Sequence, residues 1–491
     1  SGPIGLGDRV CVQPVFNDID NDGDQDLFVT SARGGNALFR NDGKGKFEDI
    51  TKEAGVTHVG HTQGATFFDA DHDGDLDLLI TNTAHWTTNE FNEKDRYWAG
   101  VPDLYKLIES KIELNIYYRN DGTGKFEDAT EEAGLKGVGW GGDTIVFDYD
   151  EDGDTDLLVG NMFGHSLLYD NDGKGKFKIV TYEVLGRTPL GTVGAHVLDF
   201  DGDGHLDFYL VDMHSDMWIP VRYPREEVEA KRKYDNFYGA LRHEVGLDLA
   251  QWEAFQRIIN VDKKKVFFGN GLFRFVKPGQ FEEISGPADA ETFWPWGVAV
   301  GDFDGDGDDD VFLPSGMGYP YFYWPSRLLM NDGGKRFVEE GKAAGLDPPP
   351  GGENLGRIRG HISTRSARSA SVGDFNGDGR LDLIVVNFND RSHLYMNEWP
   401  ATNYVKFRLT GTKSNRDAIG ATLRVHCGDR VFVGLVAAAG GYLAQSSKDV
   451  HFGLGAIDSI DRCEIRWPSG VVQVIEKPAI NKTHKVVEPA Q

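Results

Sequence analysis

The chain repeats one acidic nine-residue segment six times, and this repeat restricts the possible folds more than any other feature. Its pattern is Asp-x-Asp/Asn-x-Asp-Gly-x-x-Asp, and an apolar run such as LFVT or LIVV follows each copy. Self-similarity at a period of about 20–50 residues is typical of arrays in which each small unit packs against the next. We therefore expect a repeat architecture rather than several unrelated domains.

A second motif recurs between the acidic copies and sets the size of the unit. Asn-Gly turn segments lie around Asn41, Asn120, Asn171 and Asn331, with weaker copies around Asn270 and Asn397. Asn and Gly tolerate the positive φ that a tight hairpin needs. Where nothing is inserted, the unit is about 51 residues long and is interpreted as strand, acidic loop, strand, connection, strand, turn, strand. Four strands per unit indicate the blade of a β-propeller, so we predict an all-β propeller over residues 1–398.

The number of blades and the closure of the ring stay open in the sequence. Six units are counted, and seven blades are possible. The fourth strand of the last blade has to come either from the RVCVQPVF segment at 9–16 or from the chain after Asn397. Insertions are expected near 84–114, 213–262 and 344–368. The second insertion is rich in helix-forming residues and is predicted to be helical.

The acidic loops predict bound calcium. Carboxylates at positions 1, 3, 5 and 9 repel one another strongly unless a cation lies between them. Ca²⁺ accepts six to eight oxygen ligands in flexible geometry, and Gly at position 6 permits the sharp bend. Position 7 varies, as expected if its backbone carbonyl is the ligand. An EF-hand shares the first six positions but needs Glu at position 12, where this chain has an aliphatic residue in every copy.

The candidate ligands are five residues in each loop, for about six Ca²⁺ ions in total. They are Asp18, Asp20, Asp22, Asp24 and Asp26; Asp69, Asp71, Asp73, Asp75 and Asp77; Asp148, Asp150, Asp152, Asp154 and Asp156; Asp199, Asp201, Asp203, His205 and Asp207; Asp302, Asp304, Asp306, Asp308 and Asp310; and Asp374, Asn376, Asp378, Arg380 and Asp382. The sixth loop is the weakest candidate, because Asn376 replaces an acid and Arg380 brings a positive charge.

These loops resemble the calcium-binding hairpin loops of FG-GAP repeats, which form the blades of integrin α-subunit propellers. The resemblance covers residues 10–398 and implies bound calcium in the loops. It also implies a ring of seven blades, which keeps that number open here.

The composition changes after Asn397, where the acidic loops stop. Alternating apolar positions between Gly-rich turns predict six or seven strands over 399–491, enough for a β-sandwich. The segments NRDAIGA at 415–421, VHFGLG at 450–455 and WPSG at 467–470 resemble the ASPIC/UnbV module. In secreted proteins related to cartilage acidic protein, that module follows FG-GAP repeats, and its sandwich is transthyretin-like. The resemblance therefore implies that fold here.

Charge and cysteine content narrow the functional classes. A formal charge of −27 makes nucleic-acid binding through a basic face improbable. The sequence also has no run of eighteen apolar residues, the length that a membrane-spanning helix needs. Millimolar extracellular calcium would fill such loops, which favours secretion. Cys427 and Cys463 lie in predicted strands of the sandwich, and the sequence leaves open whether they are bridged.

The sequence favours a binding, adhesion or structural protein over an enzyme. Its expected partner is an extracellular protein or a glycan, and self-assembly through Arg357, Arg359, Arg365 and Arg368 is a further hypothesis. The alternative is a carbohydrate-binding or carbohydrate-active protein that uses aromatic insertions, including Trp86, Trp98, Trp294 and Trp296.

Two histidine arrangements are the remaining candidates for chemistry. His196 and His214 flank the fourth loop, and Asp212 or Asp216 could pair with His214 as an acid–base couple, although a structural role is favoured. His58 and His61 could share a metal ion, but no third ligand is identifiable in the sequence.

Overall fold

The computed structural model describes residues 4–92, 97–100, 113–137, 140–213, 264–267, 269–292, 294–316, 325–346, 366–388 and 391–490. The predicted helix at 213–262 and most of the insertion at 344–368 lie outside these ranges. All structural statements below refer to the described residues.

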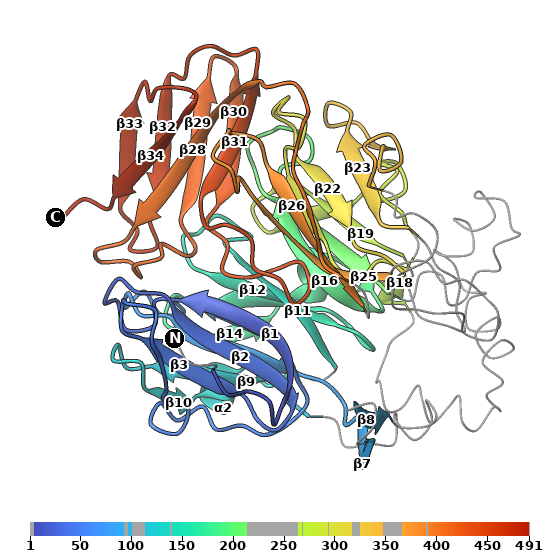
Figure 1. Cartoon of the computed structure of the whole chain (residues 1–491). Coiled ribbons are helices and arrows are strands. Elements are labelled where there is room, and N and C mark those ends of the chain that lie inside the picture. The colour runs from blue at the N-terminus through green and yellow to red at the C-terminus, as the bar shows by residue number, and fades with distance from the viewer. Residues whose placement is uncertain are drawn as a thin grey trace, which may run out of the picture.

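Six antiparallel sheets follow one another along the chain, as the progression of colour in Figure 1 shows. The first five have four strands and the sixth has three among the described residues. Their strands are β1 (Val10–Asn17), β2 (Asp26–Arg33), β3 (Ala37–Asn41) and β4 (Phe47–Asp49); β5 (Thr62–Phe68), β6 (Asp77–Asn82), β9 (Ile116–Asn120) and β10 (Phe126–Asp128); β11 (Gly141–Phe147), β12 (Asp156–Asn161), β13 (Leu167–Asn171) and β14 (Phe177–Ile179); β16 (Thr192–Leu198), β17 (Asp207–Asp212), β19 (Gly271–Lys277) and β20 (Gln280–Glu283); β21 (Ala299–Gly301), β22 (Asp310–Leu313), β23 (Arg327–Asn331) and β24 (Phe337–Glu339); and β25 (Ser366–Gly373), β26 (Asp382–Phe388) and β27 (His393–Tyr395).

Several smaller elements lie outside the six sheets. They are the hairpin β7 (Thr87–Asn92) and β8 (Tyr97–Gly100), the parallel pair β15 (Thr188–Pro189) and β18 (Val266–Phe267), and the one-turn helices α2 (Thr130–Ala133) and α3 (Thr181–Val184). The all-β class predicted from the repeat is confirmed.

The sheets pack face to face, and apolar side chains fill the space between neighbours. One such core joins Phe68 and Tyr117 of the second sheet to Val146, Leu157 and Tyr169 of the third. Strands with both faces covered need apolar residues at successive positions rather than alternating ones. That requirement explains runs such as LLIT in β6, all of which is buried.

Within the described residues, no strand shared between the first and the last sheet closes the six sheets into a ring. The segment at 9–16 contributes to β1, which pairs with β2 as the first strand of the first sheet, so the proposal that it completes the last blade is wrong. A segment of the chain after Asn397 instead bonds both ends of the array. Gln445 exchanges hydrogen bonds with the backbone of Phe16 in β1, and Ser447 N donates to Val372 O of β25 at 3.0 Å.

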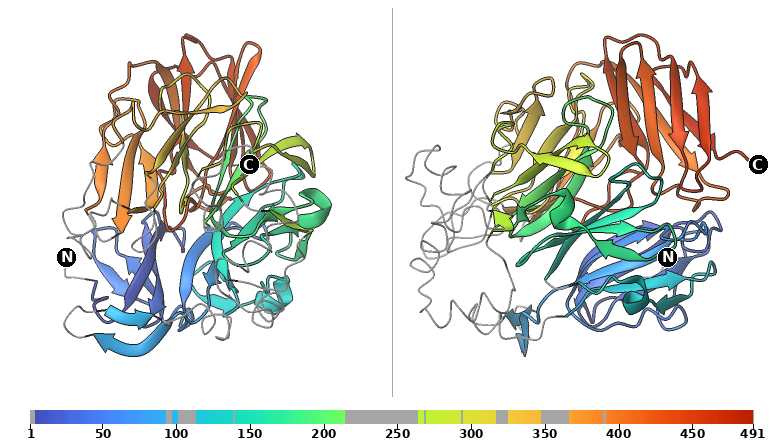
Figure 2. Two further views of the ribbon diagram at one scale, coloured as in Figure 1. Left: turned by 90° about the vertical axis from the view of Figure 1, so that its right-hand side faces the viewer. Right: turned by 180° about the vertical axis from the view of Figure 1, so that it is seen from behind.

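The C-terminal region forms two sheets that face each other. One contains β28 (Asn403–Thr410), β31 (Val450–Gly455) and β34 (Lys482–Val487), and the other contains β29 (Thr422–Cys427), β30 (Arg430–Leu435), β32 (Arg462–Arg466) and β33 (Val472–Glu476). We call this region the C-terminal module. Figure 2 shows from two further sides that it lies against the array of sheets.

The module shares a hydrophobic core with the first two sheets rather than standing apart. One continuous cluster contains Val15 and Phe67 of those sheets together with Phe407 and Trp467 of the module. Cys427 and Cys463 are both buried as free thiols, so no disulfide bond joins them in the structure.

One predicted turn is misplaced in the fourth unit. Asn270 directly precedes β19 instead of ending it, and the hairpin between β19 and β20 turns at 278–279. The position that a turn Asn occupies elsewhere is taken by Phe275, whose backbone N–H donates to Asp207 at 2.7 Å. The sequence FGNG imitates the motif because an Asn also stands before the third strand in the first and second units, as Asn36 and Asn115.

Candidate calcium-binding loops

All six acidic loops join the first two strands of their sheets. Position 1 directly follows the first strand, and position 9 is the first residue of the second strand, as Asp18 and Asp26 show in the first sheet. The loops therefore share one end of the array. The C-terminal module covers this end, because each position-6 glycine faces an atom of the module.

The position-6 glycines are required for both conformation and space. All six have φ between +84° and +106°, a region that residues with a Cβ rarely adopt. A Cβ on Gly74 would lie 2.2 Å from Lys413 O, and one on Gly379 would lie 2.1 Å from the Tyr404 ring. These glycines thus permit both the bend of the loop and the close approach of the module.

The carboxylates at positions 1, 3 and 5 converge within each of the first, second and fourth loops. Asp18, Asp20 and Asp22 form one such group, in which an oxygen from each lies within 4.8 Å of the others. Asp69, Asp71 and Asp73 form the second group, and Asp199, Asp201 and Asp203 form the fourth. In the third loop the group contains Asp148, Asp150 and the position-9 residue Asp156.

Several oxygens in these groups are buried and have no hydrogen-bond donor in the part of the chain that the structure describes. They are Oδ1 of Asp20, Asp69, Asp71, Asp148, Asp150 and Asp201. Buried carboxylate oxygens normally find a donor or a metal ion. Several hard oxygen donors around one point fit Ca²⁺, so the residues present suit the ion that the loop pattern predicts.

The electrostatics of the loops support the same interpretation. Burial, with repulsion from Asp73, raises the pKa of Asp69 to about 7, and burial with repulsion from Asp152 raises that of Asp148 to about 7. In the fourth loop, burial and the nearby Asp309 raise the pKa of Asp199 to about 8. In the fifth loop, burial and repulsion from Asp306 raise the pKa of Asp302 well above its usual range. A bound cation would relieve this repulsion and keep the groups ionised.

The position-9 aspartates act mainly as anchors between strands. In the third sheet, Asp156 Oδ1 accepts from Asn171 N at 2.8 Å and Oδ2 accepts from Tyr149 N at 3.2 Å. The same pair of backbone contacts recurs at Asp26, Asp77, Asp207, Asp310 and Asp382. This residue therefore fixes the loop to the third strand of its own sheet.

Side chains at position 7 make contacts outside the position-1, -3 and -5 groups. Asp75 accepts from Asn21 of the preceding loop at 3.1 Å, and Asp154 lies 3.0 Å from His72 Nε2. His205 Nδ1 lies 2.9 Å from Glu151 Oε1 in the same way. Asp24 lies close to Gly43, and Asp308 pairs with Arg430 of the module. The position-7 side chains thus connect neighbouring loops, turns and the module.

The sixth loop carries its own positive charges. Lys406 Nζ of the module lies 2.9 Å from Asp374 Oδ2, and both side chains are buried, at 12% and 1% exposure. Although burial raises the pKa of Asp374, the bond to Lys406 holds it below its usual value. The hydrogen bond from Arg380 lowers the pKa of Asp378 to about 2. Asn376 also donates to Asp378, so a lysine and an arginine of the chain itself neutralise two of the acids of this loop.

The acid–base pair expected beside the fourth loop centres on His214, so the described residues show only its surroundings. His196 has its Nδ1 2.7 Å from Val197 O and is half-buried in the sheet, and Asp212 accepts from Gly269 N at 2.9 Å. His214 and Asp216 lie outside the described ranges.

Several of the arginine and tryptophan side chains proposed to bind a partner contact other residues of the same chain. Arg368 lies in β25, and its guanidinium carbon is 4.2 Å from the centre of the Trp296 ring, while Arg357, Arg359 and Arg365 lie outside the described ranges. Trp294 is buried, and Trp98 contacts Phe91 and carries the Arg33 guanidinium on its ring.

Sequence comparison identifies both parts of this architecture. Residues 18–80, 148–210 and 261–313 match the FG-GAP-like repeat, and residues 366–391 match the FG-GAP repeat. Residues 411–491 match the ASPIC and UnbV family. The chain is thus built from FG-GAP repeats followed by an ASPIC/UnbV domain.

The individual protein that it resembles is cartilage acidic protein 1, to which it is distantly homologous. The protein from Homo sapiens is 23% identical over 296 residues, which are 54% of this chain and 41% of the relative. That from Xenopus tropicalis is 26% identical over 214 residues, 42% of this chain and 28% of the relative. The chain therefore spans less than half the length of the curated relatives it matches.

Solved structures show only a general likeness. An exotype rhamnogalacturonan lyase, YesX, aligns with 97% of this chain and 73% of its own at 12% identity and a TM-score of 0.33. Within the described residues, no helix is long and apolar enough to cross a membrane.

Proposed function

We propose that this chain is a secreted calcium-binding protein in which five acidic loops hold Ca²⁺ beneath the C-terminal module. The observation that carries the proposal is the set of buried, unpartnered carboxylate oxygens in the first four loops. The fifth loop joins them because burial and mutual repulsion raise the pKa of Asp304 to about 6 and that of Asp302 well above its usual range. The sixth loop is excluded because Lys406 and Arg380 hold the pKa values of Asp374 and Asp378 below their usual range, whereas the pKa of Asp148 stays raised although Arg466 lies 3.4 Å from it.

Calcium would act structurally in this arrangement. Each ion would neutralise the acids at positions 1, 3 and 5 and fix a loop on which the module rests. Extracellular modules bind Ca²⁺ with Kd values of about 10⁻⁴–10⁻³ M, so millimolar extracellular calcium would occupy the loops and cytosolic calcium would not. This difference supports secretion, as does the homology to cartilage acidic protein 1.

The proposed role is binding or structural support rather than catalysis. The acidic loops are covered by the module, so the calcium sites face another part of the same chain instead of a substrate. The partner of such a protein would be an extracellular protein or a glycan that contacts the surface away from the module.

The test is calcium titration of the metal-free chain by isothermal calorimetry, with thermal unfolding in excess calcium and in chelator. At free calcium ten times Kd, each site contributes about 1.4 kcal/mol to the free energy of unfolding, or about 7 kcal/mol for five sites. Unfolding entropy near 2 cal/mol/K per residue gives about 1 kcal/mol/K for this chain, so chelation should lower Tm by about 7 °C. No heat of binding and an unchanged Tm would refute the proposal.

Matched variants in two loops sharpen the test. Asp71→Asn removes a charge from the second loop, where Oδ1 of Asp71 is unpartnered, and should reduce the ion count by one. Asp378→Asn makes the same change in the sixth loop and should leave the count at five. Equal effects of the two variants would contradict the assignment.

A further inference from the structure

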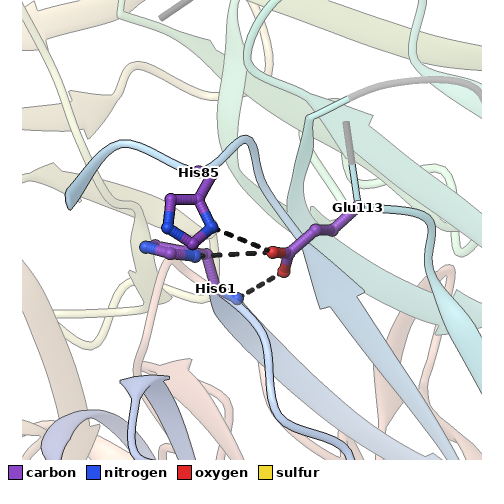
Figure 3. Close-up of side chains that lie close together, drawn as sticks. All are labelled: His61, His85 and Glu113. Atoms are coloured by element: carbon purple, nitrogen blue, oxygen red, sulfur yellow. Dashed lines mark hydrogen bonds and ion pairs between the residues drawn. The ribbon is translucent and has the colours of Figure 1, made fainter. Parts of the chain in front are cut away.

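Three side chains from distant parts of the chain meet at the end of the second sheet opposite its acidic loop. His61 directly precedes β5, His85 follows β6, and Glu113 precedes β9. Because these antiparallel strands are neighbours, the three positions fall at one sheet end. Figure 3 shows both imidazole rings turned toward the Glu113 carboxylate.

The spacing of the donor atoms fits a small metal ion. His61 Nδ1 lies 3.5 Å and His85 Nδ1 3.6 Å from Glu113 Oε1, and one donor atom from each residue lies within 4.8 Å of the others. Tetrahedral Zn²⁺ binds nitrogen and oxygen ligands at about 2.0–2.2 Å, which places neighbouring ligands about 3.4 Å apart. The ring centroids of the two histidines are 4.2 Å apart at an angle of 58°, so the rings approach one point without stacking face to face.

The two ring nitrogens of His61 differ in their hydrogen bonding. Its Nε2 lies 2.7 Å from Thr87 Oγ1 of β7, whereas Nδ1 is buried, has Glu113 Oε1 at 3.5 Å and makes no hydrogen bond within the described residues. The side chain is only 3% exposed, so water cannot readily serve Nδ1. A metal-binding histidine is typically oriented in this manner by a hydrogen bond to its other nitrogen.

A fourth candidate ligand, His58, lies nearby. His58 Nε2 is also buried without a hydrogen bond. A Cβ placed on Gly60 would lie 2.4 Å from His58 Nε2 and 2.3 Å from Glu113 Oε2, so these two atoms are within about 5 Å of each other. Glu113 Oε2 also accepts from the backbone N–H of His61, which fixes the carboxylate in place.

We propose that His61, His85 and Glu113 form a binding site for a divalent transition-metal ion of the Zn²⁺ class, with His58 as the available fourth ligand. Imidazole nitrogens with a single carboxylate favour such ions over Ca²⁺, which prefers an all-oxygen shell. The ion would tie the insertion that begins after β6 to the second sheet, since His85 and Glu113 lie at its two ends. His85 is 52% exposed, which gives the ion a path from solvent.

The sequence indicated only the pair His58 and His61. The other two ligands lie 24 and 52 residues after His61, and no fixed spacing connects them. Only the pairing of β6 with β5 and β9 brings them to the same place.

The experiment measures Zn²⁺ binding to the full chain by calorimetry, in excess Ca²⁺ so that the acidic loops do not compete. Co²⁺ substitution provides a second measurement, because tetrahedral Co²⁺ with nitrogen ligands absorbs strongly in the visible region. One Zn²⁺ per chain and a tetrahedral Co²⁺ spectrum are expected. Absence of stoichiometric Zn²⁺ binding would overturn the proposal, whatever the result for calcium.

Variants identify the ligands. His85→Ala changes an exposed side chain and should weaken Zn²⁺ binding by about 100-fold, with loss of the Co²⁺ spectrum. Glu113→Gln should act in the same direction. Thr87→Val removes only the orienting hydrogen bond and should weaken binding by about 10-fold. The matched control is His484→Ala in the C-terminal module, which should bind Zn²⁺ as the unmodified chain does. Equal affinities for His85→Ala and the control would refute the site.

Discussion

Replacing Lys406 with Met should convert the sixth loop into a calcium site. Methionine keeps an apolar stem like that of lysine but lacks the terminal ammonium group that lies 2.9 Å from Asp374 Oδ2. The Asp374 carboxylate would then be buried beneath the module without its cation. Its surroundings would then resemble those of Asp69, whose pKa burial and repulsion from Asp73 raise to about 7.

The magnitude follows from burial. Removing one partner of a buried ion pair costs about 3–5 kcal/mol, and the lower value applies because Lys406 is 12% exposed. With an unfolding entropy of about 1 kcal/mol/K for this chain, Tm in chelator should fall by about 3 °C. Calcium in the sixth loop would restore about 1.4 kcal/mol at ten times Kd, so the deficit should shrink to about 2 °C in calcium.

The assay is a calcium titration with parallel thermal melts of Lys406→Met and of a control, Lys52→Met. Lys52 is exposed and lies in the segment that connects β4 to β5. The ion count should rise from five to six for Lys406→Met and stay at five for the control. An unchanged count together with an unchanged Tm in chelator would refute the reasoning that Lys406 replaces calcium.

Three further perturbations test the remaining features. In chelator, Tm should fall as pH rises from about 5 to 9, because raised pKa values such as that of Asp199, about 8, mean that the folded chain binds more protons than the unfolded one. Excess calcium should flatten this profile, and a Tm that rises with pH in chelator would contradict it. Asn171→Ala should lower Tm by about 2–4 °C, since the Asn171 amide donates to two buried carbonyls at 2.8 and 2.9 Å, whereas the exposed Lys174→Ala should not; the check is calorimetric melting. Gly441→Ala should expose the module to limited proteolysis, because a Cβ there would lie 2.0 Å from a facing carbonyl oxygen; Gly470→Ala has a similar positive φ in open space and should stay resistant.

The repeat unit could be predicted because its determinants are local. Each acidic loop lies between two strands joined within its own sheet, and a short hairpin depends on a few turn residues and the apolar runs beside them. The same logic failed at Asn270, where an Asn of a different role imitated the turn motif. The strand order within the second sheet also followed from sequence, although β7 and β8 interrupt it.

The sequence revealed only part of the chemistry of the individual loops. The pattern placed acids at positions 1, 3, 5 and 9, but it could not separate ligands from anchors. Asp26 accepts from two backbone N–H groups, and His205 contacts Glu151, although the sequence assigned both residues to metal. Those roles depend on which neighbour approaches each side chain.

The sequence by itself determined the all-β repeat, the acidic loops and the boundary at which the C-terminal composition changes, because these properties are encoded within segments of about 50 residues. The tertiary structure decided which sites a neighbouring segment completes or neutralises. Lys406 reaches the sixth loop from the module, and His85 and Glu113 reach His61 across two strand pairings. Charges and ligands act through space over a few ångströms, and only folding brings residues distant in sequence within that range.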